Sequence, residues 1–245
     1  REFSTIGHER RNNPRLRIAD RDEFIKAKVA EHHYQPPYFR LMERLNLEGA
    51  NAAPRVMRPK HLGLDDLGES GADHLVDVRE PLAYAAGHMQ GAVCLPVGMI
   101  PAFAWWFISE GDTIALIASE EDELAQAMAH LVRIGLDNIV GGYVGVIPAA
   151  AQGKAMQSIA MIDTEEVARR LAEDSEDWTL LDVRALDERQ QGSIDGSEHV
   201  YVGELNTRWK ELDRDRHYTL MCASGMRASV AAGWLARQGF KHLDV

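Results

Sequence analysis

Residues 218–240 read YTLMCASGMRASVAAGWLARQGF, and this stretch decides the predicted fold. The apolar run Tyr218–Met221 favours a short buried strand. The composition of Ala228–Gln238 favours a helix, for which Gly239 is a suitable C-terminal stop. Between them, residues 222–227 contain a glycine and predict a tight loop. The pattern is therefore strand, loop and helix.

This loop carries a single thiol, Cys222, where the strand ends and the helix approaches. Backbone N–H groups of such a loop and the positive end of a helix favour an anion, and the same field favours a thiolate. Arg227 adds a full positive charge at the far end of the loop. Most free cysteines are small buried hydrophobic residues. Gly225, Arg227 and the strand–loop–helix context favour a nucleophile instead.

The number of residues between the thiol and the arginine indicates which reaction the loop can support. Four residues separate them, whereas loops of the tyrosine-phosphatase type are one residue longer and enclose a phosphate. A smaller ring of amides suits the terminal sulfur of a cysteine persulfide, which leaves phosphatase or arsenate-reductase activity as the weaker alternative. The loop resembles the active-site loop of the rhodanese family, the sulfurtransferases. The resemblance implies catalytic residues Cys222 and Arg227, with substrate bound by the residues between them: Ala223, Ser224, Gly225 and Met226.

Composition excludes several other classes of function. The 245 residues have room for two domains, and a net charge of −11 argues against binding nucleic acid or an anionic membrane. The most apolar run, residues 101–108, is far shorter than the roughly 18 residues that a membrane span needs. Two cysteines, Cys94 and Cys222, make no disulfide framework, so a cytoplasmic location is expected. Cys94 lies in an apolar run without a following arginine and is predicted to be structural.

An internal repeat organises most of the chain. LVDVR at residues 75–79 recurs as LLDVR at 180–184, GHMQGA at 87–92 as GSIDGS at 192–197, and IALIA at 114–118 as YTLMC at 218–222. The offsets are 105, 105 and 104 residues, so the repeat is the size of a domain. Alternating apolar and helical segments predict an α/β fold in each copy, with a parallel sheet and helices on both faces. The expected domains are residues 55–153 and 154–245.

The Asp-Val-Arg and Gly-His-x-x-Gly-Ala signatures are also similar to rhodanese hallmarks, so the resemblance extends over residues 56–245. It implies that Asp182 and Arg184 form an ion pair that supports the loop. Arg189 is a candidate for attracting an anionic donor, with a solvated surface role as the alternative. The second copy departs from the pattern at Ser193 and Tyr201, where the first has a histidine and a proline. It also stops before a counterpart of the glycine pair at 141–142, which leaves a truncated copy as one interpretation.

The first copy is predicted to be catalytically inactive. At an offset of 104, Ala118 replaces Cys222 and Glu123 replaces Arg227, with the acidic run SEED at residues 119–122. Carboxylates at this place would repel an anionic sulfur donor. A structural packing role is favoured over docking of a partner.

Residues 1–54 differ from both copies and predict two short helices, at 23–30 and 38–47. The segment resembles the C-terminal end of metallo-β-lactamase-fold proteins that precede rhodanese domains, a group that includes persulfide dioxygenases. The resemblance implies an upstream domain holding iron or zinc, and no metal or other cofactor in this chain, which lacks a His-x-His-x-Asp-His motif. Three histidines here are not expected to form a metal site: His8, His32 and His33.

The predicted function is sulfur transfer from thiosulfate or a low-molecular-weight persulfide to a thiol acceptor, through a persulfide on Cys222. The resemblance places this activity in a persulfide dioxygenase–rhodanese type of fusion, in sulfide and persulfide metabolism. The alternative is a non-enzymatic sulfur relay or regulatory module. Expected partners are a small anionic donor, a thiol acceptor and the upstream domain, and the oligomeric state is left open.

Overall fold

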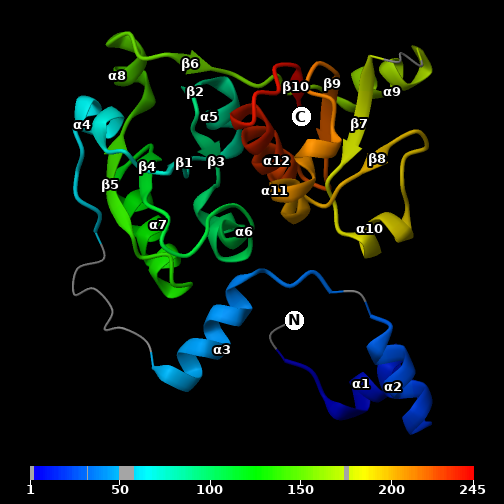
Figure 1. Cartoon of the computed structure of the whole chain (residues 1–245). Helices are drawn as coiled ribbons and strands as arrows, with labels where there is room; N and C mark the ends of the chain where they lie inside the picture. The colour runs from blue at the N-terminus through cyan, green and yellow to red at the C-terminus, as the bar shows by residue number, and fades with distance from the viewer. Residues whose placement is uncertain (1–2, 32, 50–57, 174–176) are drawn as a thin grey trace. The chain divides into compact units, whose positions relative to one another are not determined.

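The computed structural model describes residues 3–31, 33–49, 58–173 and 177–245 (Figure 1). The chain divides into two compact units, residues 1–35 and 36–245. The predicted N-terminal segment, residues 1–54, does not coincide with either unit. Its boundary at residue 54 lies outside the described residues, as does His32.

The described residues of the first unit form three short helices, α1 (Ile6–Asn12), η1 (Pro14–Arg17) and α2 (Arg21–Val29). Asp20 caps α2 by accepting a hydrogen bond from the backbone of Glu23. None of the described residues in this unit is buried. Such a segment has no apolar core of its own to stabilise it.

Helix α3 (Tyr38–Glu48) belongs to the second unit. Its Leu41 is buried, and a Cβ on Gly135 would lie 2.6 Å from the Leu41 side chain. Arg44 also forms an ion pair with Glu110. These contacts attach α3 to the first sequence copy, which explains why the predicted segment is divided.

The first copy is a parallel sheet of order β3-β1-β4-β5 surrounded by helices. Every residue of its central strand β4 is buried, as expected for a parallel sheet covered on both faces. A separate antiparallel ribbon joins β2 and β6. The elements are α4 (Leu64–Glu69), β1 (His74–Asp77), α5 (Pro81–Ala86), β2 (His88–Met89), β3 (Val93–Cys94), η2 (Val97–Met99), α6 (Ile100–Phe107), β4 (Ile114–Ala118), α7 (Glu121–Arg133), β5 (Ile139–Val144), α8 (Val146–Ala151) and β6 (Met156–Gln157).

The second copy repeats this topology with the order β10-β9-β7-β8, all parallel. Strands β8, β7, β9 and β10 correspond to β3, β1, β4 and β5, so the predicted duplication and α/β fold class are confirmed. The elements are α9 (Thr164–Glu173), β7 (Trp178–Asp182), α10 (Leu186–Gln191), β8 (Glu198–His199), η3 (Val202–Glu204), α11 (Leu205–Arg208), η4 (Trp209–Glu211), β9 (His217–Met221), α12 (Met226–Arg237) and β10 (Leu243–Asp244).

Helix α12 of the second copy packs against elements of the first copy. Gly233 lies against β3 so closely that an added Cβ would be 2.7 Å from the Cys94 backbone nitrogen and 3.0 Å from the Tyr84 hydroxyl. The aromatic rings of Trp234 and Phe107 pack with centroids 4.9 Å apart. The helix that follows the Cys222 loop is therefore held by both copies (Figure 1).

Candidate active site

The candidate nucleophile lies at the carboxyl end of β9, an inner strand of the second sheet. Ligands of open α/β sheets bind at this edge. Helix α12 starts at Met226, two residues earlier than the sequence predicts. The reason is Gly225, whose φ of +79° turns the chain into the helix without a further loop residue. Arg227 is consequently the second residue of the helix.

Cys222 is half-buried, and the loop residues Ala223 and Ser224 are exposed. Gly225 caps α12 without a side chain, so no capping oxygen competes for the first backbone N–H groups of the helix. This leaves the loop open to solvent and its amides available to an anion beside the thiol.

Arg227 is held by Glu188 of α10. Its Nη2 donates a 2.8 Å hydrogen bond to Oε1 of Glu188, and its Nη1 donates to Oε2, which makes a bidentate pair. Hydrogen bonds to Glu188 are the main reason that the pKa of Arg227 is raised, and the nearby Cys222 raises it further. The same pair lowers the pKa of Glu188. The guanidinium at the end of the Cys222 loop is thus fixed by α10.

Glu188 is the site residue that the sequence analysis missed. The repeat contained a signal, because at the offset of 105 residues Glu188 corresponds to Ala83. The first copy lacks both partners of the pair, with Ala83 in place of the glutamate and Glu123 in place of Arg227. A matched loss of this kind indicates that the two side chains act together.

Asp182 and Arg184 form the ion pair that the resemblance implies. Arg184 Nε and Nη2 lie 3.0 and 2.7 Å from Asp182 Oδ1 and Oδ2, and Nη2 also donates to the Gly192 carbonyl at 2.8 Å. Burial acts to raise the pKa of Asp182, but the hydrogen bonds from Arg184 outweigh it and lower the pKa. Asp182 itself is fully buried.

The first copy has the same arrangement. Arg79 donates to Asp77 through Nε at 2.8 Å and Nη2 at 2.6 Å, and Nη2 also donates to the Gly87 carbonyl. Since the pair is kept in the copy that lacks the loop thiol, its contribution is to the geometry of the strand end.

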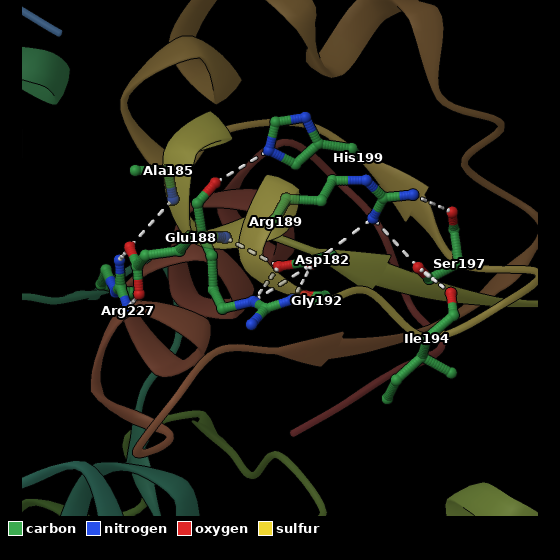
Figure 2. Close-up of polar contacts among 10 residues, drawn as sticks. Asp182, Ala185, Glu188, Arg189, Gly192, Ile194, Ser197, His199 and Arg227 are labelled. Carbon is green, nitrogen blue, oxygen red and sulfur yellow. Dashed lines mark hydrogen bonds and ion pairs between the residues drawn. The ribbon is translucent and has the colours of Figure 1, made fainter. Parts of the chain in front are cut away.

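Arg189 extends towards Ser197, away from Arg227 (Figure 2). Its Nη1 donates to the Ser197 hydroxyl at 3.0 Å, its Nη2 donates to the Ser197 carbonyl at 2.8 Å, and a longer contact of 3.4 Å reaches Asp182. The structure therefore brings Arg189 into contact with the β7–β8 region, while its neighbour Glu188 meets the loop arginine.

The loop of the first copy contains an internal anion. The backbone N–H of Ser119 donates to Oε2 of Glu123 at 2.7 Å, and β4 ends in the apolar Ala118. The Glu123 carboxylate thus accepts a hydrogen bond from the Ser119 amide, which corresponds to the Ala223 amide of the second copy. Cys94 is buried on β3, and burial raises the pKa of its thiol well above the ordinary value.

A metal centre finds no support among the described residues, where no three His, Cys, Asp or Glu side chains come together as ligands. His33 contacts Glu31 at 2.9 Å, and His8 contacts Asn12 within α1. In the part of the chain that the structure describes, no helix combines the length and the apolar character needed to cross a membrane.

The rhodanese-like domain model matches two stretches of the chain, residues 63–148 and 163–245. The chain belongs to the rhodanese-like family. One stretch falls in each sequence copy, so the rhodanese-like domain is present twice. The predicted resemblance of residues 56–245 to this family is confirmed.

Curated relatives carry sulfur-related names. The chain is 33% identical over 87 residues to the putative sulfurtransferase YtwF of Bacillus subtilis (strain 168), a match that covers 36% of this chain and 84% of the relative. It is 34% identical over 84 residues to the putative sulfur carrier protein YrkF of the same organism, covering 34% of this chain and 45% of that protein. The chain thus spans less than half the length of the second relative.

A structural neighbour is a metallo-beta-lactamase from Staphylococcus aureus subsp. aureus COL. The TM-score is 0.48 at 23% sequence identity, and the match covers 58% of this chain and 40% of the neighbour.

Proposed function

We propose that the second rhodanese-like copy is a sulfurtransferase that carries sulfane sulfur on Cys222. The observation that carries this proposal is a half-buried thiol at the carboxyl end of β9, on a four-residue loop that ends at an arginine fixed in place by Glu188. The four-residue loop beside it leaves room for a terminal sulfur.

The reaction proceeds in two displacement steps. The Cys222 thiolate attacks the outer sulfur of thiosulfate or of a small persulfide, an S–S bond forms to Cys222, and sulfite or a thiolate leaves with the electron pair. An acceptor thiolate then attacks the outer sulfur of Cys222–S–S⁻, takes it as a new persulfide and restores the Cys222 thiolate. Atoms and charge balance in both steps without an oxidant.

Each site residue has a distinct contribution in this scheme. The amides of the loop and the positive charge of Arg227 stabilise the anionic persulfide. Glu188 orients Arg227, and the Asp182–Arg184 pair supports the neighbouring strand end. Arg189 is proposed to add positive potential for an incoming anion without touching the reacting sulfur.

Intact-mass spectrometry tests this proposal directly. The chain is exposed briefly to thiosulfate or to glutathione persulfide, with Cys222→Ala as the variant and Cys94→Ala as the matched control. A gain of one sulfur that cyanide removes, and that only Cys222→Ala abolishes, is expected. No gain with either donor while Cys222 is demonstrably reduced would refute sulfur transfer.

A relay function is the second candidate, favoured by the exposed loop residues Ala223 and Ser224, which a protein partner can reach. In a relay, Cys222 persulfide is discharged slowly by every small thiol and rapidly by one protein. Single-turnover discharge rates with glutathione, dithiothreitol and candidate carrier proteins separate the two functions.

We further propose that the N-terminal segment adjoins a metallo-β-lactamase-fold domain that holds iron or zinc, as in persulfide dioxygenase fusions, and that both work in the cytoplasm. Its support is the resemblance of residues 4–49. Mixing a purified persulfide dioxygenase domain with this chain tests the partnership: sulfite formation from glutathione persulfide should change with wild type but not with Cys222→Ala.

A further inference from the structure

A buried histidine connects the two rhodanese-like copies. His74 is the first residue of β1 in the first copy and is 7% exposed. Its Nδ1 lies 2.8 Å from Nη1 of Arg237, the last residue of α12 in the second copy. Its Nε2 lies 2.9 Å from Oδ2 of Asp112, in the segment that leads to β4. We call the three side chains of Asp112, His74 and Arg237 the His74 bridge.

The two contacts determine where the imidazole carries its proton. A guanidinium has donors only, so Nδ1 of His74 accepts the hydrogen bond from Arg237 and carries no proton itself. The single proton of the neutral ring then lies on Nε2, which donates to the carboxylate of Asp112. The bridge therefore requires one tautomer of the neutral imidazole, between a cation and an anion.

Protonation of His74 would break the bridge at its Arg237 end. A proton on Nδ1 converts the acceptor into a donor, so two donors and two positive charges would face each other. Arg237 does not relieve this repulsion by losing a proton, because a guanidinium in a protein stays charged. The contact between the copies is thus compatible with only one of the two charge states of His74.

The position of Arg237 is fixed by further contacts. Its Nη2 donates a hydrogen bond to the backbone carbonyl of Asp73 in the first copy. Its guanidinium also lies over the ring of Trp234, with the central carbon 5.8 Å from the ring centroid. These contacts hold the cation beside the imidazole, so a protonated His74 would meet it at close range.

The carboxylates near His74 do not cancel this effect. Among the described residues, Asp112 and Asp73 favour a protonated imidazole, whereas burial and Arg237 oppose it. Burial has the largest influence, and the pKa of His74 is lowered from its ordinary value of 6.5. The Asp73 carboxylate is already occupied by Thr113, whose backbone N–H and hydroxyl donate to it at 2.8 and 2.7 Å.

The bridge belongs to the contact between the copies and not to the repeated fold. At the offset of 105 residues His74 corresponds to Thr179, which does not titrate and accepts a hydrogen bond from Arg216 at 3.2 Å. At the offset of 104 residues Arg237 corresponds to Arg133, which is exposed at the end of α7.

We propose that the His74 bridge is a pH-sensitive contact between the two rhodanese-like copies, closed while the imidazole is neutral and opened when it is protonated. It holds the C-terminal end of α12, the helix whose second residue is Arg227. The bridge does not depend on sulfur transfer, so Cys222→Ala should retain it.

The direction of the pH dependence follows from the two charge states. The unfolded chain binds a proton at His74 more readily than the folded chain, because the folded-state pKa is the lower one. The stability that the bridge contributes is therefore complete above pH 6.5 and is lost as pH falls through the folded value.

A pH titration of the histidine Cε1–H signals by NMR, on the full chain, tests the bridge, with His74→Gln to assign the signal. The His74 midpoint should lie below 6.5 in wild type and rise by about one pH unit in Arg237→Gln, which removes the facing cation. Arg237→Lys keeps a cation and should keep the low midpoint. Arg133→Gln, at the corresponding helix end of the first copy, is the matched control and should leave the midpoint unchanged.

Urea unfolding at a series of pH values provides a second readout. Wild type should lose stability as pH falls below 6.5, and His74→Gln should remove this part of the loss because its amide does not titrate. His130→Gln, at a half-buried histidine of α7, is the matched control and should keep the pH dependence of wild type.

Three results would overturn the proposal. These are a wild-type His74 midpoint at or above 6.5, a midpoint that Arg237→Gln does not raise although circular dichroism shows it folded, and a pH dependence of unfolding that His74→Gln leaves unchanged. If Arg237→Gln does not fold, the wild-type midpoint and the unfolding of His74→Gln decide the question.

Discussion

The bidentate pair between Glu188 and Arg227 leads to a prediction about the rate at which sulfur is loaded onto Cys222. Glu188→Gln keeps the shape of the side chain but removes its charge, so Arg227 keeps one hydrogen bond, to a neutral amide oxygen, and loses the other. The side chains are 19% and 34% exposed, which reduces the value of the pair below that of a buried one. A net loss of about 1 to 1.5 kcal/mol in orienting the guanidinium corresponds to a five- to tenfold slower reaction.

Stopped-flow loading of Cys222 with thiosulfate, followed by persulfide mass, measures this rate. Asp187→Asn removes a neighbouring exposed charge and serves as the control for net charge. A rate for Glu188→Gln that equals that of the control, or exceeds wild type, would refute the idea that Glu188 positions Arg227.

The pH dependence follows from the direction of the Glu188 shift. Its folded-state pKa is lowered from 4.5, so the carboxylate contributes stability above its unfolded value, and this contribution disappears as pH falls through the lower folded value. The stability difference between wild type and Glu188→Gln in urea unfolding should therefore persist to pH below 4.5 and shrink only as pH falls further. A stability difference that disappears above pH 4.5, or that does not change with pH at all, would contradict this assignment.

Three further outcomes are expected. Cys222→Ser should abolish sulfur loading, which mass spectrometry detects, while Cys94→Ser should retain it because that thiol is buried on β3. Gly233→Ala should lower stability by about 1 to 3 kcal/mol in urea unfolding, since its Cβ would meet backbone at 2.7 Å, whereas Gly98→Ala meets nothing within 4 Å and should be neutral. Asp182→Asn should lower stability by roughly 2 to 3 kcal/mol, because it leaves Arg184 beside an uncharged buried partner; an unchanged unfolding midpoint would count against a structural role.

Local patterns in the sequence predicted a large part of the fold. The apolar run before Cys222 became β9, and the helical composition after it became α12, because both signals come from residues close together in the chain. The repeat predicted two sheets of the same topology, which the strand orders confirm. The helix start differs by two residues, since the left-handed Gly225 shortened the loop.

Contacts between distant residues were harder to predict. Helix α3 belongs with the first copy because Leu41 packs against Gly135, far along the chain. The close approach of Gly233 to β3 likewise depends on how the copies pack.

The sequence by itself determined the candidate nucleophile, the cationic end of its loop and the loss of both in the first copy. Only the tertiary structure decided that Glu188 holds Arg227 from 39 residues away, and that Arg189 faces Ser197 instead. The physical reason is range: strand and helix patterns act over a few residues, whereas ion-pair partners and cavities depend on where whole elements pack.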